Sequence, residues 1–421
     1  MFSHETITAL TDSFIHSLQT EMLQKAKQLT HFLALLLLLL PATPISALEV
    51  NPVGPGPYAV GTSNMQVKND FRDLSDNQIR AYLAGNFTAS GKRAFVTDVL
   101  KYPQEALIVN VKVPDHEEVY GPIAGETLPV LVYITYPTTP ENNRNDYAFP
   151  FPDAPDNALQ HMQGPGEKPI FADEHERYPV VLISHGRNVH GIWEIGHARR
   201  LASHGYIAVT VNYGDLRIQN GGQGTHDLLF RPLAGKAVLD HVLSSEDFGN
   251  HIDHSRIATS GHSMGGFTSL ALAGGRYLDN DQSVHDPRVS AVVAAAPWVG
   301  GKRFSTPYFL FGDDNTGLSK VSAPVLAVFG SNDEATIKSS ILPAMDQLSG
   351  PRYVIELVAQ PHVFEGGSWQ DLGNWELLFL SAHLKGNADS LQLLNSASSM
   401  KGGNEDIQHF DLQRAPDRLH D

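Results

Sequence analysis

The chain has 421 residues, no cysteine and a formal net charge of −16. This length allows one large α/β domain or two to three smaller domains. The lack of cysteine excludes disulfides, zinc–thiolate sites and a cysteine nucleophile. The acidic charge, with no long basic tract, argues against nucleic acid and anionic lipid surfaces as main partners, and solubility alone explains it.

The N-terminal segment up to Ala47 has the pattern of a secretory signal peptide. An apolar run at 33–40 follows Lys25 and Lys27 and precedes a stretch of small residues. The run is too short to span a membrane, so we expect cleavage after Ala47, a secreted or periplasmic protein, and no stable membrane anchor afterwards. Met22 is an alternative start, and a buried core helix is the alternative interpretation of the run.

Residues 48–127 are predicted to form an N-terminal extension that includes the first strands. Its opening part, 48–75, is rich in Gly and Pro, which indicates extended chain, and a helix could follow near 76–83. Apolar runs at 107–113 and 130–136 predict two strands, which we expect to pair antiparallel at a sheet edge.

Residues 137–178 are predicted to be a long insertion without regular structure, because they are rich in Pro, Asn and Asp. A connection of this length usually flanks a functional site or is disordered. We expect this one to flank the site and to give a more covered cleft.

Short apolar strands alternate with helices from residue 178 onward. We expect strands at 180–184, 206–211, 256–259, 289–295, 325–329 and 353–357. We expect helices at 192–204, 229–243, 267–273, 337–348 and 374–384. This alternation predicts an α/β fold with a mostly parallel sheet covered on both faces, within one catalytic domain over 128–385. Residues 386–421 are predicted to be a polar, loose C-terminal tail.

The stretch Ser260–Gly266, Ser-Gly-His-Ser-Met-Gly-Gly, places a serine between glycines at a predicted strand-to-helix turn. This arrangement is typical of a nucleophile elbow. The turn is sharp, and a β-carbon beside the serine would clash with the neighbouring strand or helix. Ser263 is therefore the predicted nucleophile, and the Met264 N–H is a predicted oxyanion donor.

An acid and a base are expected after later strands, in the chain order Ser, Asp or Glu, His. Asp333 and His362 directly follow the last two predicted strands. Carboxyl ends of parallel strands meet at one edge of a sheet, so both side chains should reach Ser263. Asp333 could instead be a helix N-cap, with Glu334 or Asp313 as the acid.

The loop after the first buried strand should supply the second oxyanion donor. Gly186 allows the backbone to approach a substrate closely, and Arg187 N–H is the predicted donor. Trp298 follows another strand, so we expect it to line the substrate site with Gly186 and His262; its alternative role is a core-edge aromatic. His185 and His262 are expected to support the site rather than to act as bases.

No metal or cofactor is expected. Four polar residues could suggest calcium, namely Asp279, Asn280, Asp281 and Asp286. They lack the Gly and Glu positions of a calcium loop, and a solvated loop is the expected structure.

Four motifs together resemble those of α/β-hydrolases. They are Ser184-His185-Gly186, the run Arg200–Tyr206, Gly261–Gly266, and Ala296-Pro297-Trp298. The chain is most similar to bacterial cutinases and polyester hydrolases, and to platelet-activating-factor acetylhydrolase-like and predicted dienelactone-hydrolase-like esterases. The resemblance covers about residues 128–385.

This resemblance implies the same site assignments. The oxyanion donors of the cutinase-like group correspond to Arg187 and Met264, its cleft tryptophan to Trp298, its acid to Asp333 and its base to His362. Arg187 replaces an aromatic residue of that group, so an aromatic clamp on the substrate is not expected. The chain lacks the acid position of animal-type acetylhydrolases and the cysteine of dienelactone hydrolases.

We therefore expect a secreted serine esterase that cleaves a small-molecule or polymeric carboxylic ester through an acyl-enzyme. The alternatives are a phospholipase A2-like acetylhydrolase, a cutin or polyester hydrolase, a serine peptidase and a non-catalytic binding protein.

Overall fold

The computed structural model describes residues 48–66, 75, 78, 95–149, 158–187, 189–215, 226–276, 284–300, 311–312, 314–401 and 407–413. The predicted signal peptide, Asp279, Asn280, Asp281 and Asp313 lie outside these residues. So does the helix predicted at 76–83, except for residue 78.

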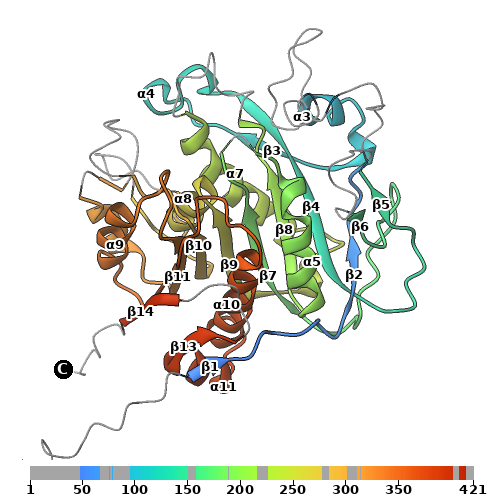
Figure 1. The fold of residues 1–421 in the computed structure, drawn as a ribbon. Coiled ribbons are helices and arrows are strands. Elements are labelled where there is room, and N and C mark those ends of the chain that lie inside the picture. Colours follow the sequence, from blue (N-terminus) through green and yellow to red (C-terminus); the bar gives the residue numbers. More distant parts are fainter. Residues whose placement is uncertain are drawn as a thin grey trace, which may run out of the picture. The chain divides into compact units, whose positions relative to one another are not determined.

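A ten-stranded sheet forms the centre of the described part of the chain (Figure 1). Its strands are β2 (Ala59–Thr62), β3 (Leu107–Lys112), β4 (Thr127–Thr138), β7 (Tyr178–Ser184), β8 (Ile207–Asn212), β9 (Ile252–His262), β10 (Val289–Ala295), β11 (Val325–Gly330), β12 (Arg352–Leu357) and β14 (Ile407–Gln413). The order across the sheet is β14-β12-β11-β10-β9-β7-β8-β4-β2, with β3 also paired to β4. The pairs from β8 through β12 are parallel, whereas β2, β3, β4 and β14 pair antiparallel.

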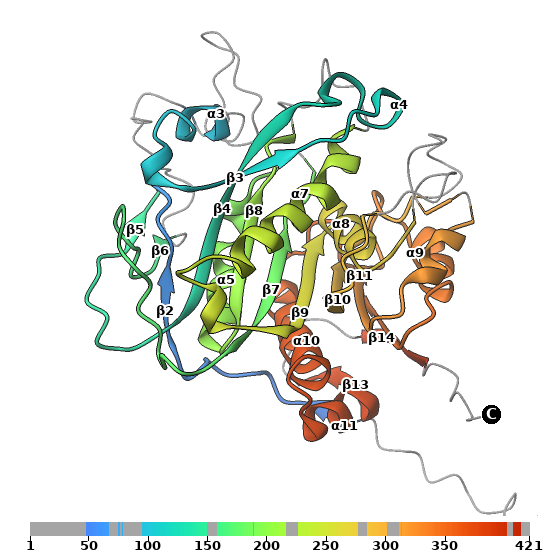
Figure 2. The same ribbon diagram turned by 180° about the vertical axis from the view of Figure 1, so that it is seen from behind.

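Helices cover both faces of this sheet. The described α-helices are α3 (Phe95–Val99), α4 (Glu117–Tyr120), α5 (Ile195–Ser203), α7 (His226–Leu243), α8 (Met264–Leu272), α9 (Lys338–Asp346), α10 (Ser368–His383) and α11 (Ala388–Ser396). Short 3₁₀ turns are η1 (Pro103–Glu105), η2 (Gly121–Ile123), η3 (Gly191–Glu194), η5 (Gly249–His251) and η6 (Thr316–Lys320). Figure 2 shows α7 and α8 over one face, and Figure 1 shows α5 and α10 over the other.

Alternate side chains of each central strand enter two separate cores. Val180 and Leu182 pack into the core that contains α7 and α8, whereas Val181 and Ile183 pack into the core that contains α5 and α10. A strand buried on both faces needs apolar residues at every position, which explains the continuous apolar runs. The predicted α/β fold with a mostly parallel sheet is confirmed, as is the antiparallel pair at its edge.

The predicted loose tail after residue 386 is wrong for its described residues. The chain there forms α11, then β13 (Ala397–Met400), which pairs parallel with β1 (Leu48–Val50), and later β14, which extends the main sheet. Leu394, Ala397 and Met400 are buried and hold this segment against the core of α5 and α10. Similarly, α10 begins at Ser368 rather than at the predicted residue 374.

In the described part of the 137–178 insertion, the ring contacts of Phe171 lie away from the predicted site. It contains a small antiparallel pair, β5 (Tyr147–Ala148) and β6 (Ala158–Leu159). Phe171 stacks on Tyr178, the first residue of β7, and on His251, which directly precedes β9. These contacts lie at the amino ends of parallel strands, whereas the predicted catalytic residues follow the carboxyl ends.

Candidate active site

Ser263 lies at the sharp turn between β9 and α8, in a backbone conformation that is rare for a serine. Its φ is 57° and its ψ is −116°. Such a conformation costs about 1–3 kcal/mol and persists only where surrounding contacts impose it. Here the Ser263 N–H donates to the Ala295 carbonyl at 2.8 Å, and the Ser263 carbonyl accepts from the N–H of Trp298 at 2.9 Å and of Gly266 at 3.0 Å.

Three glycines around Ser263 are required by close packing. A β-carbon on Gly261 would lie 2.4 Å from the Gly265 carbonyl carbon. One on Gly265 would lie 1.9 Å from the Ser184 carbonyl oxygen, and one on Gly266 would lie 2.8 Å from the Pro297 side chain. These distances are far below van der Waals contact, so the turn and the strand β7 can approach only through glycine.

We expect Gly265→Ala to destabilise the protein by about 3 kcal/mol, because the new methyl group would overlap the backbone of β7. Gly196→Ala is the matched control, because a β-carbon there meets nothing within 4 Å at the start of α5. This control should change the free energy of unfolding by less than about 1 kcal/mol. Urea denaturation measures both, and equal stability of the two variants would refute the packing argument.

The structure brings together the three residues predicted to perform catalysis. His362 Nε2 lies 2.9 Å from Ser263 Oγ, and His362 Nδ1 lies 2.8 Å from Asp333 Oδ2. The carboxylate can only accept, so Nδ1 carries the proton and donates it to Asp333. Nε2 is then the acceptor for the Ser263 hydroxyl. This is the arrangement in which a histidine can take a proton from a serine.

Asp333 is held by donors on both of its oxygens. Oδ1 accepts the N–H groups of Ala335 at 2.8 Å and Thr336 at 2.7 Å. Oδ2 accepts the Thr336 hydroxyl at 2.5 Å in addition to His362. Burial alone would raise the pKa of Asp333, but the hydrogen bonds from His362 and Thr336 hold this pKa below its ordinary value. The carboxylate is therefore charged at neutral pH.

Thr336 is a site residue that the sequence reasoning missed. Its hydroxyl lies within hydrogen-bond range of Asp333, the Ala296 carbonyl and His362 Nδ1. The signal available in the sequence was weak: an aspartate in a loop often accepts the N–H two residues on, here that of Ala335, which is next to Thr336. Asp333 is not a helix N-cap, because α9 begins at Lys338 with Ile337 as its N-cap.

The loops that carry the acid and the base are bound to each other. A β-carbon on Gly330 would lie 2.1 Å from the Gln360 carbonyl oxygen, and Asn332 N–H donates to that carbonyl at 3.0 Å. On the other side, His262 Nε2 donates to the carbonyl of His362 at 2.7 Å. Burial and the nearby His362 lower the pKa of His262, which keeps this imidazole neutral.

Gly186 and Trp298 lie beside the serine turn. A β-carbon on Gly186 would be 3.7 Å from Ser263 Cβ and 3.4 Å from His262 Nδ1. The Arg187 guanidinium carbon is 5.8 Å from the centre of the Trp298 ring, which is within cation–π range. Gly186 and Ser263 are thus close neighbours, and the predicted oxyanion donors Arg187 and Met264 directly follow them in the chain. The role of these two N–H groups stays a prediction.

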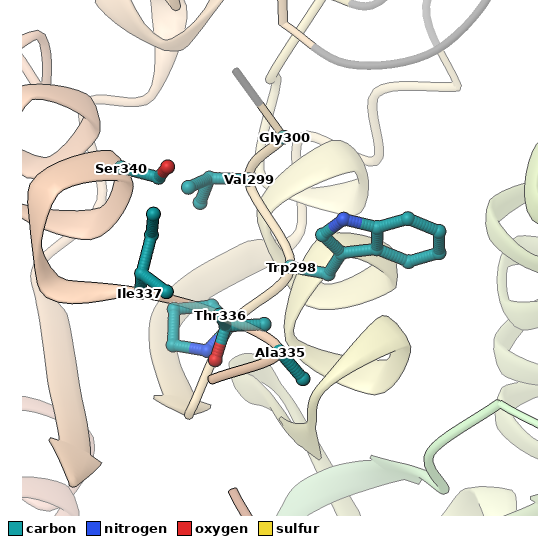
Figure 3. Close-up of a pocket in the computed structure, with 8 residues that line it drawn as sticks. Trp298, Val299, Gly300, Ala335, Thr336, Ile337 and Ser340 are labelled. Carbon is teal, nitrogen blue, oxygen red and sulfur yellow. The ribbon is translucent and has the colours of Figure 1, made fainter. Parts of the chain in front are cut away.

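A small cavity of about 10 Å³ lies between the loop after β10 and the loop that leads into α9 (Figure 3). Its lining residues are Pro297, Trp298, Val299, Gly300, Ala335, Thr336, Ile337 and Ser340. The Trp298 indole points away from Val299, Ile337 and Ser340 in Figure 3. Substrate binding by Trp298, His262 and Gly186 stays a prediction.

Within the described residues, no group of three or more His, Asp and Glu side chains is arranged to hold a metal ion. Asp286 instead binds Arg288, with the Arg288 Nε 2.8 Å from Asp286 Oδ1. None of the helices in the described ranges has the length and apolar content needed to span a bilayer.

A mostly parallel sheet, helices on both faces and a strained serine turn beyond β9 define an α/β-hydrolase. The family model for PET hydrolase-like proteins matches residues 190–406, just over half of the chain. The chain belongs to the PET hydrolase-like family.

Curated relatives agree with this assignment. Cutinase est1 of Thermobifida alba is 28% identical over 174 residues, which are 40% of this chain and 53% of that protein. Cutinase 2 of Thermobifida cellulosilytica is 28% identical over 185 residues, or 43% of this chain and 62% of that protein. The cutinase of Thermobifida fusca (strain YX) is 27% identical over 185 residues, or 43% and 54%. The chain thus spans between about half and three fifths of the length of these relatives. The resemblance to cutinases and polyester hydrolases is confirmed.

Proposed function

We propose that this protein hydrolyses carboxylic esters through an acyl-enzyme on Ser263. The observation that carries the proposal is the hydrogen-bonded series from Ser263 Oγ through His362 to Asp333, with distances of 2.9 and 2.8 Å. Membership of the PET hydrolase-like family supports the same activity.

In the proposed reaction, Ser263 Oγ attacks the acyl carbon while His362 Nε2 takes the hydroxyl proton. The charged Asp333 stabilises the imidazolium and keeps Nδ1 protonated. The N–H groups of Arg187 and Met264 bind the oxyanion of the tetrahedral intermediate. His362 then protonates the leaving alcohol, and water repeats the sequence on the acyl-enzyme to release the acid.

The substrate we propose is a polyester or a cutin-type polymer. Two observations favour it over a phospholipid: the family is described as PET hydrolase-like, and the curated relatives are cutinases. The exposed indole of Trp369 also lies 5.4 Å from the His262 ring, so an apolar surface adjoins the proposed site.

The test is a substrate panel assayed with purified protein: p-nitrophenyl esters of increasing acyl length, an amorphous polyester film and short-chain phosphatidylcholine. Ser263→Ala serves as the blank. Hydrolysis of the p-nitrophenyl esters together with release of acid from the film supports the proposal. Turnover of phosphatidylcholine alone would favour an acetylhydrolase, and no turnover of any ester would refute ester hydrolysis.

Export through the signal peptide predicted to end at Ala47 is part of this proposal. N-terminal sequencing of protein recovered from the medium of an expressing bacterium tests it. A mature N-terminus at Leu48 is expected, and an uncleaved chain retained in the cells would contradict it.

A further inference from the structure

A buried ion pair lies beneath the loop that follows β7. Arg231 on α7 is fully buried, and Asp215 is 2% exposed. Arg231 Nε donates to Asp215 Oδ1 at 2.9 Å, and Nη2 donates to Oδ2 at 2.5 Å. A buried pair of this kind rarely stabilises a fold more than apolar residues of equal volume would, because both charges must leave water. Its presence calls for a role other than stability.

Arg231 also donates to the backbone of this loop. Nη1 donates to the His185 carbonyl at 2.5 Å, and Nη2 donates to the Gly186 carbonyl at 2.9 Å. The guanidinium thus connects Asp215 to two consecutive carbonyls. A planar fork of fixed donors can hold two carbonyls in one orientation, whereas the rotatable donors of a lysine ammonium have no fixed geometry.

His185 adds a second donor to the Gly186 carbonyl. The Tyr213 N–H donates to His185 Nε2 at 3.3 Å, so the ring proton is on Nδ1. Nδ1 lies 2.7 Å from the Gly186 carbonyl oxygen and donates to it. Burial, followed by the charge of Arg231, lowers the pKa of His185 to about 4, so the imidazole is neutral at pH 7.

The orientation of the Gly186 carbonyl fixes that of the next N–H. The peptide between Gly186 and Arg187 is planar and trans, so its C=O and N–H point in opposite directions. Two hydrogen bonds hold the C=O toward Arg231 in the protein interior. The Arg187 N–H must therefore point away from Arg231. Gly186 itself packs beside Ser263, since a β-carbon placed on this glycine would lie 3.7 Å from Ser263 Cβ.

We propose that Arg231, with its charge balanced by Asp215, is a positioning residue that orients the Arg187 N–H toward the oxyanion. The inference rests on the proposed ester hydrolysis. Arg231 does not touch the substrate; it acts through the peptide plane. An oxyanion donor is worth about 100- to 1,000-fold in rate only when it is held in place before the reaction.

The test compares Arg231→Lys and Asp215→Asn with the control Arg288→Lys. Arg288 also pairs with a buried carboxylate, Asp286, and its second ion pair is with Asp240 rather than with the loop at Gly186. Arg231→Lys should lower kcat for p-nitrophenyl acetate about 100-fold while KM changes less than about threefold, because the donor acts on the transition state. Affinity for a trifluoromethyl ketone, which mimics the tetrahedral intermediate, should fall by a similar factor. Arg288→Lys should change neither.

Thermal unfolding separates these effects from loss of structure. A folded Arg231→Lys that keeps kcat within about threefold of wild type would overturn the inference, as would an equal loss of kcat in Arg288→Lys. If no Arg231 or Asp215 variant folds, a crystal structure of the wild type with a phosphonate on Ser263 decides. A phosphonate oxygen within hydrogen-bond distance of Arg187 N, with the Gly186 carbonyl still on Arg231, supports the inference, and any other orientation of this peptide overturns it.

A refutation of the proposed ester hydrolysis can be distinguished from a refutation of the positioning role of Arg231. Wild-type protein that hydrolyses no ester, or Ser263→Ala that keeps its activity, refutes ester hydrolysis at Ser263 whatever the Arg231 variants do. Wild-type activity that depends on Ser263 but is insensitive to Arg231→Lys refutes only the positioning role.

Discussion

Replacing Ser263 with alanine is expected to lower kcat for p-nitrophenyl acetate about 10⁶-fold, because the variant cannot form an acyl-enzyme. The Ser263 hydroxyl lies 2.9 Å from His362 Nε2, at the end of the hydrogen-bonded series that would activate it. The variant should keep its fold, since the backbone bonds that hold the turn involve only the main chain of residue 263. Steady-state kinetics and circular dichroism measure the two effects.

Ser260→Ala is the matched control for this variant. Ser260 is buried and lies on β9, three residues before the proposed nucleophile at the turn that follows this strand. Its replacement should leave kcat within about twofold of the wild-type value, as expected for a change outside the catalytic groups. Turnover retained by Ser263→Ala would refute Ser263 as the nucleophile, whatever the control does.

Replacing Asp333 with asparagine is expected to lower kcat about 10⁴-fold. The carboxylate accepts the Nδ1 proton of His362 at 2.8 Å and so leaves Nε2 free of a proton. An asparagine can present its amide N–H to Nδ1, which favours the tautomer with the proton on Nε2. That tautomer cannot accept the Ser263 proton. Steady-state kinetics should show this fall in kcat with little change in KM.

Glu334→Gln distinguishes Asp333 from its neighbour as the acid. Glu334 is exposed and next in the chain, and it was the alternative acid at the level of sequence. We expect this variant to retain nearly full activity. A severe loss in Glu334→Gln combined with a mild loss in Asp333→Asn would transfer the proposed role to Glu334.

The central sheet could be predicted because its strands are buried on both faces. A segment such as Val180–Ser184 has no polar position that water must reach, so it is distinct in the sequence. The chain order of Ser263, Asp333 and His362 then followed from where parallel strands end. Predicting the positions of these three residues required only local sequence patterns and the sheet topology that those patterns imply.

The missed features depend on contacts between distant parts of the chain. Arg231 reaches carbonyls 46 and 45 residues earlier in the chain, and nothing near it in the sequence marks these partners. The C-terminal segment is rich in Ser, Asn and Gln, yet its buried Leu394, Ala397 and Met400 dock it onto the core. The 137–178 insertion was placed near the site on its length alone, and length does not specify which end of the sheet a loop covers.

The pairing of β1 with β13 has a consequence for biosynthesis. Leu48 pairs with Ala397, so β1 stays without its partner strand until the segment that contains β13 has been synthesised. Until then β1 presents unpaired backbone groups, and exposed strand edges promote association between chains. We therefore expect loss of the C-terminal segment to lower the yield of folded protein more than it lowers the rate of the chemical step at Ser263.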